Sequence, residues 1–247
     1  MFRTIGMMQP YLFPYLGYFQ LIAASDAFVL GDNLQYSKGS WVNRNRVLCQ
    51  GQPKLFSFGL QKASIETPIN ERYLSEHFAH EAASFLRLLR NAYARAPHRD
   101  AVLEQVERIL AFAEPNLALF AENSIHEICR YLDIRTPIHR ASEFDLPPPT
   151  DKQDRVVQLM HRLRGDLYLN PIGGMELYSP AHFRRHGLLL RFLKMDDITY
   201  PQLGHPFVPA LSIIDVLMFN SRQEIQRLLP RFTALEGRET EPEGRVA

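Results

Sequence analysis

Polar side chains gather at two places in the first 36 residues, at the points where apolar runs end. Gln9 follows the run Thr4–Met8, and Asp32 and Gln35 follow the run Ala27–Leu30. Amide groups can hold polar groups of a small ligand, and the carboxylate of Asp32 can accept hydrogen bonds from a hydroxyl group or act as a base. The alternative is a well-packed N-terminal strand. We favour a site, because three polar groups at two adjacent strand ends would converge.

Aromatic residues accompany these groups in the proline-containing loop that follows Gln9. Tyr11, Tyr15 and Tyr18 each combine an apolar ring with a polar tip, so they can cover the ring of a bound substrate. Packing at the edge of the strand is the stronger interpretation for the tyrosines as a group. Tyr11 and Tyr18 are kept as substrate-binding candidates.

A basic segment at residues 41–46, with the sequence W-V-N-R-N-R, is the next candidate. Strand alternation would place the two asparagines on one side and the two arginines on the other. The planar guanidinium of Arg44 suits a phosphate or carboxylate, and Trp41 is the only tryptophan in the chain. A solvated strand edge that happens to be basic explains the segment about as well.

A second polar strand end lies at Asn170, which is followed by Gly173 and Gly174. Paired glycines after a strand allow backbone N–H groups to face a ligand. Tyr178, just beyond, could stack on a sugar or a base. An ordinary Gly-Gly loop is the competing interpretation.

The last candidates lie in the loop at residues 200–207. Gln202 is expected to point into the same cleft as Gln9, Asp32 and Asn170, because distant strand ends assemble the sites of α/β proteins. His205, in a rigid Gly/Pro setting, is the rival general base, although a loop histidine is often merely exposed.

Asp215 lies inside an apolar run, and a buried unpaired carboxylate is costly, so it must have a partner. Ser212 is expected to cap the helix that contains Asp215. This places the carboxylate in the first helical turn, where negative charge is favourable. We therefore interpret Asp215 as structural.

The elements that position these groups alternate between strand and helix, which predicts an α/β fold with a mostly parallel sheet and the strand at Thr4–Met8 in its centre. We expect one domain over residues 1–235 with a helical insertion at about 72–132, and a disordered charged tail at 236–247. Further strands are expected at 55–60, 134–139, 167–170 and 188–193, and helices at 77–95, 101–113, 115–132, 152–163, 212–219 and 223–229. Residues 37–45 are expected to be a loop.

Composition excludes several classes of protein. The chain has 28 Lys and Arg against 27 Asp and Glu, so its net charge of +1 gives no reason to expect nucleic acid as a partner. Cys49 and Cys129 are read as free thiols, and the nine histidines form no metal set. No apolar run approaches the about 18 residues of a membrane span. We expect a cytoplasmic protein, and the sequence indicates no particular cofactor.

Three groups of motifs resemble the WbqC-like protein family. They are M-Q-P-Y-L-F-P-Y-L-G-Y-F-Q-L-I at residues 8–22, D-x-F-V-x-x-D-x-x-Q-Y at 26–36 with W-V-N-R-N-R at 41–46, and Y-L-N, G-G, L-Y, Y-x-Q and L-S-I-I-D-V-L-M-F-N between 168 and 220. The likeness spans residues 5–220. This family is associated with O-antigen gene clusters, so the resemblance implies a role in lipopolysaccharide or other surface-polysaccharide biosynthesis. It favours an anion or substrate clamp for the 41–46 segment.

The first loop also resembles that of the nucleotidylyltransferase branch of adenine-nucleotide-binding (HUP-like) folds. Those enzymes carry a glycine–histidine pair near the helix start, where the histidine steadies phosphates. Gly17-Tyr18 stands at that place here. A tyrosine carries no positive charge at neutral pH, which counts against nucleotidyl transfer but leaves the fold intact.

Two functions are compared. One is a transferase that binds a nucleotide-activated sugar or another phosphate-containing donor and transfers a group or an acyl unit. The other is a non-catalytic binding protein in a biosynthetic complex. Turnover of a nucleotide-sugar or nucleotide separates the two. A carrier protein and a second copy of the chain are left open as partners.

Overall fold

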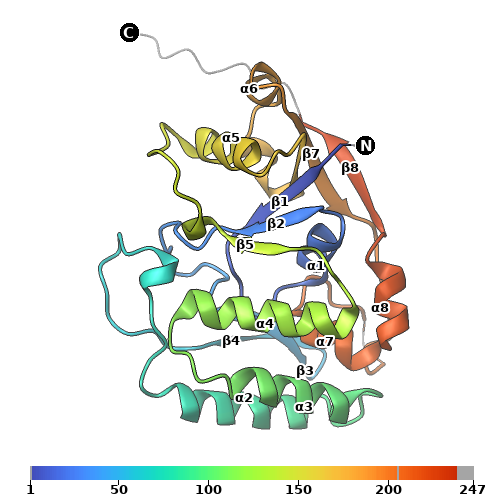
Figure 1. Cartoon of the computed structure of the whole chain (residues 1–247). Helices are drawn as coiled ribbons and strands as arrows, with labels where there is room; N and C mark the ends of the chain where they lie inside the picture. The colour runs from blue at the N-terminus through green and yellow to red at the C-terminus, as the bar shows by residue number, and fades with distance from the viewer. Residues whose placement is uncertain (1, 205, 238–247) are drawn as a thin grey trace.

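Short strands with alternating side chains form a six-stranded sheet at the centre of the computed structural model, which describes residues 2–204 and 206–237 (Figure 1). The order across the sheet is β5–β2–β1–β6–β7–β8. The strands are β1 Thr4–Met8, β2 Ala27–Leu30, β5 Ile138–Arg140, β6 Leu167–Pro171, β7 Leu189–Met195 and β8 Phe232–Glu236.

All neighbouring strands of this sheet are parallel except β7 and β8, so the predicted mostly parallel sheet with an inner β1 is confirmed. Numbered along the chain, the six strands follow the order 3-2-1-4-5-6 of doubly wound sheets. The order reverses between β1 and β6. In such sheets ligands bind beyond the carboxyl ends of the strands at this switch point.

The two faces of the sheet pack against cores of different size. Ile5, Met7 and Val29 point to a smaller core under α5 (Lys152–Arg162) and α6 (Pro180–Arg185), above the sheet in Figure 1. Phe28 and Leu30 point to the larger core on the opposite face, which includes α1 (Leu16–Ala23). The cavity described below opens on the α5 side of the strand ends.

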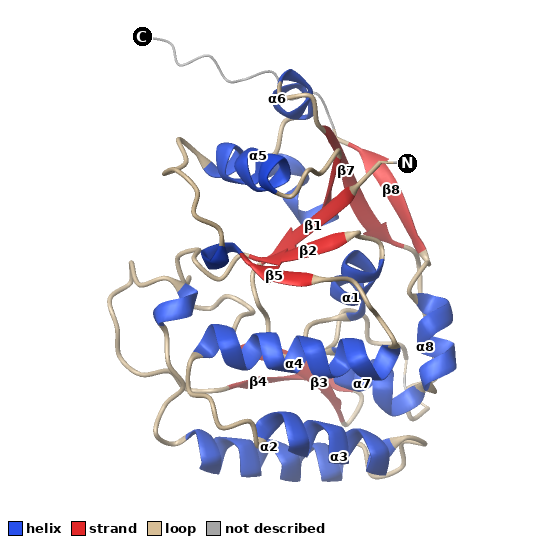
Figure 2. Ribbon diagram, viewed as in Figure 1, coloured by secondary structure: helices blue, strands red, loops and turns tan. Residues whose placement is uncertain are grey.

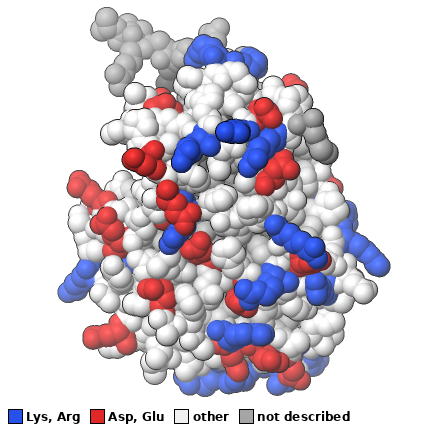
Figure 3. All heavy atoms as spheres, in the orientation of Figure 1, with Lys and Arg blue, Asp and Glu red and all other residues white. Residues whose placement is uncertain are grey.

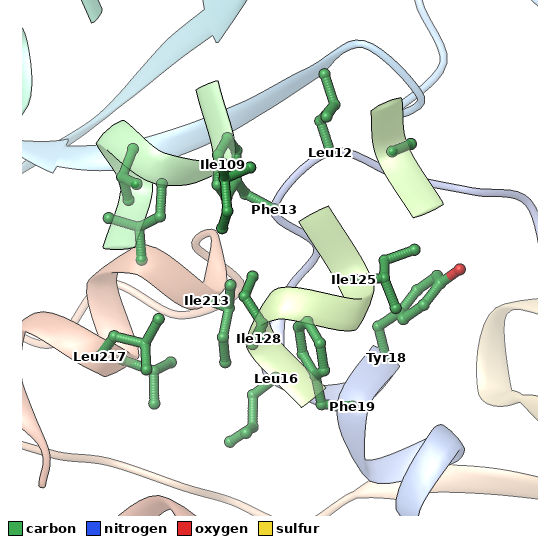
Figure 4. Close-up of a cluster of buried hydrophobic side chains, with 14 of the residues drawn as sticks. Leu12, Phe13, Leu16, Tyr18, Phe19, Ile109, Ile125, Ile128, Ile213 and Leu217 are labelled. Atoms are coloured by element: carbon green, nitrogen blue, oxygen red, sulfur yellow. The ribbon is translucent and has the colours of Figure 1, made fainter. Parts of the chain in front are cut away.

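The loop between β1 and α1 is anchored in the larger core. Leu12 and Phe13 are completely buried, and they meet residues of α1, α3, α4 and α7 in the cluster drawn in Figure 4. Phe13 has a φ of 47°, a left-handed conformation that is unusual for a bulky residue. Its carbonyl accepts hydrogen bonds from Asn45 Nδ2 and Ser212 Oγ, both at 2.8 Å. These bonds hold the loop in one shape.

The predicted helical block is present as α2 (Phe78–Ala92), α3 (Arg99–Leu110) and α4 (Leu117–Leu132). Asn116 begins α4 by accepting from the backbone N–H groups of Ala118 and Leu119. The remaining helices are α7 (Ile213–Phe219) and α8 (Arg222–Leu228), with short 3-10 turns at Ile69–Glu71, Ala141–Glu143 and Ile172–Leu177. The expected cap on α7 is confirmed, because Ser212 Oγ accepts from Ile214 N at 3.3 Å.

A separate hairpin, β3 (Arg44–Cys49) with β4 (Gln52–Ser57), lies apart from the main sheet (Figure 2). The loop expected over residues 37–45 therefore ends before Arg44, where β3 begins. The strand expected at 55–60 corresponds to β4, which begins at Gln52 and ends at Ser57. Gln50 and Gly51, with φ of 52° and 72°, form the two-residue connection that fixes the register.

Strand β8 was not expected from the sequence. It is a strand of five residues at the edge of the sheet and pairs only with β7. An ion pair of 2.7 Å joins its last residue, Glu236, to Arg191 of β7. The disordered tail expected to begin at residue 236 is thus wrong at Glu236 itself, and residues 238–247 lie outside the described part of the chain. Within the described residues, no helix is long and apolar enough to cross a membrane.

Candidate functional site

A cavity of about 640 Å³ lies at the carboxyl ends of β1 and β2, and we call it the strand-end cavity. Gln9 follows β1, and Asn33 and Gln35 follow β2, so the parallel register that pairs Met8 with Leu30 brings these residues to one edge. Its full lining is Met7, Gln9, Asn33, Leu34, Gln35, Ser37, Pro149, Asp151, Lys152, Arg155, Val156, Leu177 and Tyr178.

The start of α5 forms the opposite wall and brings two cations to the cavity. Asp151 begins the helix by accepting hydrogen bonds from Gln153 N at 2.7 Å and Asp154 N at 2.8 Å. Arg155, one turn along, donates from Nη1 to Asn33 Oδ1 at 3.1 Å. Among the described residues, neither Lys152 nor Arg155 has a carboxylate within ion-pair distance. The wall therefore offers positive charge to a ligand.

Tyr178 closes the third side and is held by residues at the end of β6. Its ring meets the Tyr168 ring edge-on, with centroids 5.5 Å apart, and the Tyr168 hydroxyl donates to Asn170 Oδ1 at 3.0 Å. Burial raises the pKa of Tyr178, so its hydroxyl stays a neutral donor. Asn170 is itself 5% exposed and supports this wall without lining the cavity.

Gly174 is required by Asn170. A Cβ at Gly174 would lie 1.9 Å from Asn170 Nδ2, so only glycine leaves room for the amide. Gly173 is exposed, and nothing lies within 4 Å of a Cβ placed there. The two glycines therefore have different surroundings, and only Gly174 contacts the predicted site.

Asp32 lies beside the strand-end cavity but is 1% exposed. Its Oδ1 accepts from Ser142 N at 3.0 Å and its Oδ2 accepts from Ser142 Oγ at 2.5 Å. Ser142 belongs to the turn that follows β5, so the carboxylate ties the ends of β2 and β5 together. Asp32 and Asn170 stand at the same edge of the sheet, as the shared-site prediction requires.

Trp41 lines a different cavity of about 200 Å³, the Trp41 pocket, together with Tyr11, Tyr15, Asn45, Arg46 and Ala210. The guanidinium carbons of Arg44 and Arg46 lie 5.3 and 5.2 Å from the centre of the Trp41 ring. Arg44 and Tyr11, expected in the cleft with Gln9, are thus associated with this second cavity or its rim. The predicted single cleft is divided between two cavities.

Gln202 lies in neither cavity. It is 2% exposed, and its Nε2 donates to Asp215 Oδ2 at 2.7 Å. Asp215 also accepts from the hydroxyls of Tyr93 at 2.8 Å and Tyr200 at 2.7 Å, which supplies the partners expected for this carboxylate. Burial is the main reason that the pKa of Asp215 is raised. We call Asp215, Tyr93, Tyr200 and Gln202 the Asp215 cluster.

Of two further residues predicted for the site, Tyr18 lines neither cavity and His205 lies outside the described residues. Tyr18 is completely buried in α1, where its hydroxyl donates to the Gln9 carbonyl at 2.9 Å and steadies the end of β1.

Sequence reasoning missed Asn33, Lys152 and Arg155. The missing signal was at the start of the helix expected over residues 152–163, because Asp151, directly before it, is a good N-cap residue. A helix that starts directly after a loop at the strand ends brings its first-turn cations to the site. In the described part of the chain, no group of three or more His, Cys, Asp or Glu side chains could hold a metal ion.

Comparison with known proteins gives one family. The sequence model of the WbqC-like protein family matches residues 9–227. An uncharacterized protein of Mycobacterium tuberculosis (strain H37Rv), Rv1507c, is 26% identical over 226 residues, which cover 88% of this chain and 94% of the relative. No solved structure matches the chain. The match includes the strand ends, the 41–46 segment and the start of α5.

Proposed function

The chain belongs to the WbqC-like protein family, and on that premise we propose that it is a transferase of cell-surface glycan or related biosynthesis. Its donor would be a nucleotide-activated sugar or another phosphate-containing molecule, bound in the strand-end cavity. The glycan part of this proposal rests on the association of the family with O-antigen gene clusters. The donor part rests on the chemistry of the cavity.

The observation that carries the proposal is the pair of cations at the start of α5, which has no carboxylate partner among the described residues. Arg155 is anchored by a neutral amide, so its charge remains available to an anion. The carboxylate of Asp151 already accepts from the first backbone N–H groups of α5, so the positive charge of this wall comes from the side chains of Lys152 and Arg155. A diphosphate would place its charge here, where Arg can hold two oxygens at once.

The other walls fit the remainder of such a donor. The amides of Gln9 and Gln35 can hold hydroxyl groups, and the Tyr178 ring can cover a sugar or a base. Lys152 and Arg155 would stabilise negative charge on a leaving nucleotide, which is the main demand of group transfer from a phosphate. The strand order 3-2-1-4-5-6 supports the resemblance to HUP-like folds, in which nucleotides bind at strand ends.

Asp32 and His205 are proposed as the candidate bases. Asp32 is the neighbour in sequence of Asn33, which lines the cavity, and its carboxylate is in no ion pair among the described residues. A base in this position would remove the proton from an acceptor as the new bond forms.

One observation favours the alternative, a non-catalytic binding protein. Both oxygens of Asp32 accept from Ser142, and the one carboxylate that lines the cavity, Asp151, accepts the capping bonds of α5. A ligand could therefore bind between the cations without meeting a free base. The two functions differ in turnover and share the ligand.

A thermal-shift screen of nucleotides, nucleotide-sugars and acyl thioesters tests the proposal. A ligand that binds only the folded state at 100 times its Kd stabilises it by about 2.7 kcal/mol. Arg155→Gln should remove most of the shift, while Arg108→Gln, which removes an exposed arginine of α3, should leave it unchanged. Release of nucleotide that depends on an added acceptor identifies a transferase, and binding without release identifies the alternative. A thermal shift that is unchanged in Arg155→Gln contradicts the site.

A further inference from the structure

Two arginines whose charge no carboxylate neutralises lie beside Trp41: Arg46 lines the Trp41 pocket, and Arg44 contacts the Trp41 ring without lining the pocket. Among the described residues, Arg44 and Arg46 take part in no ion pair, and the Nε atoms of both are buried without a hydrogen-bond partner. A buried donor without a partner costs free energy. Trp41, which is 37% exposed, stacks near both guanidinium groups and fixes their positions. The positive charges of Arg44 and Arg46 therefore have no anionic partner among the described residues.

Two tyrosines face the same space with free hydroxyl groups. Tyr11 and Tyr15 line the pocket, and neither hydroxyl makes a hydrogen bond with a described residue. Burial raises the pKa of Tyr15 to about 12 and that of Tyr11 above its ordinary value, so both remain protonated donors. Aromatic rings with hydroxyl donors suit a polar ring such as a sugar.

The walls of the pocket are rigid before any ligand arrives. Asn45 Nδ2 donates to the Phe13 carbonyl at 2.8 Å, and Ser212 N donates to the Arg46 carbonyl at 2.9 Å. Arg46 Nη2 lies 3.5 Å from the Ala210 carbonyl, which leaves the rest of its fork free. These bonds join strand β3 to the β1–α1 loop and to the segment before α7. A preorganised pocket loses less entropy when it binds.

The pocket is also close to the strand-end cavity. Gln9 lines that cavity and Tyr11 lines the Trp41 pocket, and the Cα atoms of residues two positions apart are separated by about 7 Å at most. The β1–α1 loop thus contributes to the walls of both cavities.

We infer that the Trp41 pocket is a second binding site, for a sugar that carries a carboxylate or a phosphate. Arg46, with Arg44 behind the indole, holds the anionic group, and Tyr11 and Tyr15 contact the ring. The inference of an anion site depends only on the residues of the Trp41 pocket. Its role as the acceptor subsite beside the donor rests on the function proposed above.

Intrinsic fluorescence tests the site directly, because Trp41 is the only tryptophan of the chain. The probes are glucuronate, glucose 1-phosphate and neutral glucose, titrated into the whole protein. We expect both charged sugars to change the Trp41 emission at concentrations at least tenfold lower than glucose does. The stronger of the two charged probes identifies the anionic group.

The variants separate this site from the strand-end cavity. Arg46→Gln should weaken the response to the charged sugars at least tenfold, and Arg155→Gln should leave it unchanged while removing most of the thermal shift of a nucleotide-sugar. Should Arg46→Gln fail to fold, 1 M NaCl added to the native protein must weaken the charged probes and leave glucose unaffected. Equal responses to glucose and the charged sugars, or a response that persists in Arg46→Gln, would overturn the inference. If the charged sugars change the Trp41 emission but no nucleotide-sugar binds, the Trp41 pocket remains an anionic-sugar site, and only the proposed nucleotide-sugar donor is refuted.

Discussion

The Asp215 cluster and the strand-end cavity both gather polar side chains from distant segments, but only one of them is complete. In the cluster, Asp215 accepts three hydrogen bonds from Tyr93, Tyr200 and Gln202, and all four residues are largely shielded from water. In the cavity, Lys152 and Arg155 have no anionic partner among the described residues.

This difference separates a structural role from a binding role. A buried polar group whose bonds are all made inside the fold stabilises that fold. A charged group that faces open space without a partner adds little to stability and leaves its interactions for a ligand. Figure 3 shows charges of both signs interspersed over the visible face, so surface charge alone does not indicate either region.

Replacing Asp215 should have the largest effect on stability. Asp215→Ala leaves two tyrosine hydroxyls and one amide without their acceptor, and the expected loss is about 3 kcal/mol of unfolding free energy. Urea denaturation measures the loss. Asp100→Ala, at an exposed position of α3, is the matched control and should cost less than about 0.5 kcal/mol. A loss below 1 kcal/mol in Asp215→Ala would contradict the structural role.

The catalytic half of the proposed function predicts the next largest effect. Asp32→Asn should lower kcat about 100-fold with KM nearly unchanged if the carboxylate is the base. Steady-state kinetics with the nucleotide-sugar identified by the thermal screen give both constants, and His205→Ala tests the rival base. Ser142→Ala removes one donor to Asp32 while keeping the carboxylate. A rise in Kd as large as the fall in kcat would show that Asp32 only holds a hydroxyl.

A smaller effect is expected at the rim of the Trp41 pocket. Arg44→Lys keeps the positive charge but loses the planar fork, so binding of a charged sugar should weaken several-fold while the melting temperature stays the same. The Trp41 fluorescence titration measures the affinity. An unchanged affinity would place the anion entirely on Arg46.

The dependence of stability on pH should be the most subtle difference. Burial raises the pKa of Asp215 above its ordinary value of 3.8, so the folded state holds this proton more tightly than the unfolded state does. The stabilisation from this proton is complete below 3.8 and is lost as pH rises through the raised pKa. The stability difference between the native protein and Asp215→Ala, followed by urea denaturation at several pH values, should therefore fall as pH rises. A stability difference that grows as pH rises would contradict the raised pKa of Asp215.

Much of the fold followed from local patterns. The alternation of apolar runs with Gly, Pro and Asp predicted the inner β1, the helices α2, α3 and α4, and the Ser212 cap, because each of these depends on residues close in sequence. The edge strand β8 and the β3 half of the hairpin were missed. Both are short, and their partners rather than their own composition make them strands.

The candidate site was harder to predict, since it depends on which strand ends meet. Gln9 and Gln35 were placed at one edge by the parallel topology, and Tyr178 reached the same cavity through β6. Gln202 could not be separated from them by type, because a satisfied glutamine and a free one look identical in sequence. Lys152 was hidden in a helix whose start lies over that edge only in the folded chain.

The pairing of β2 with β5 has a consequence for how the protein folds. These two parallel strands are neighbours in the sheet, yet residues 31–137 lie between them in the chain. Closing so long a loop costs entropy before any contact is gained, which slows the formation of non-local pairs. We therefore expect the edge with β5, and with it the Ser142–Asp32 contact, to form late in folding, after the helical block has collapsed. Amide hydrogen exchange during refolding should protect β6 and β7, which only residues 172–188 separate in the chain, before β5.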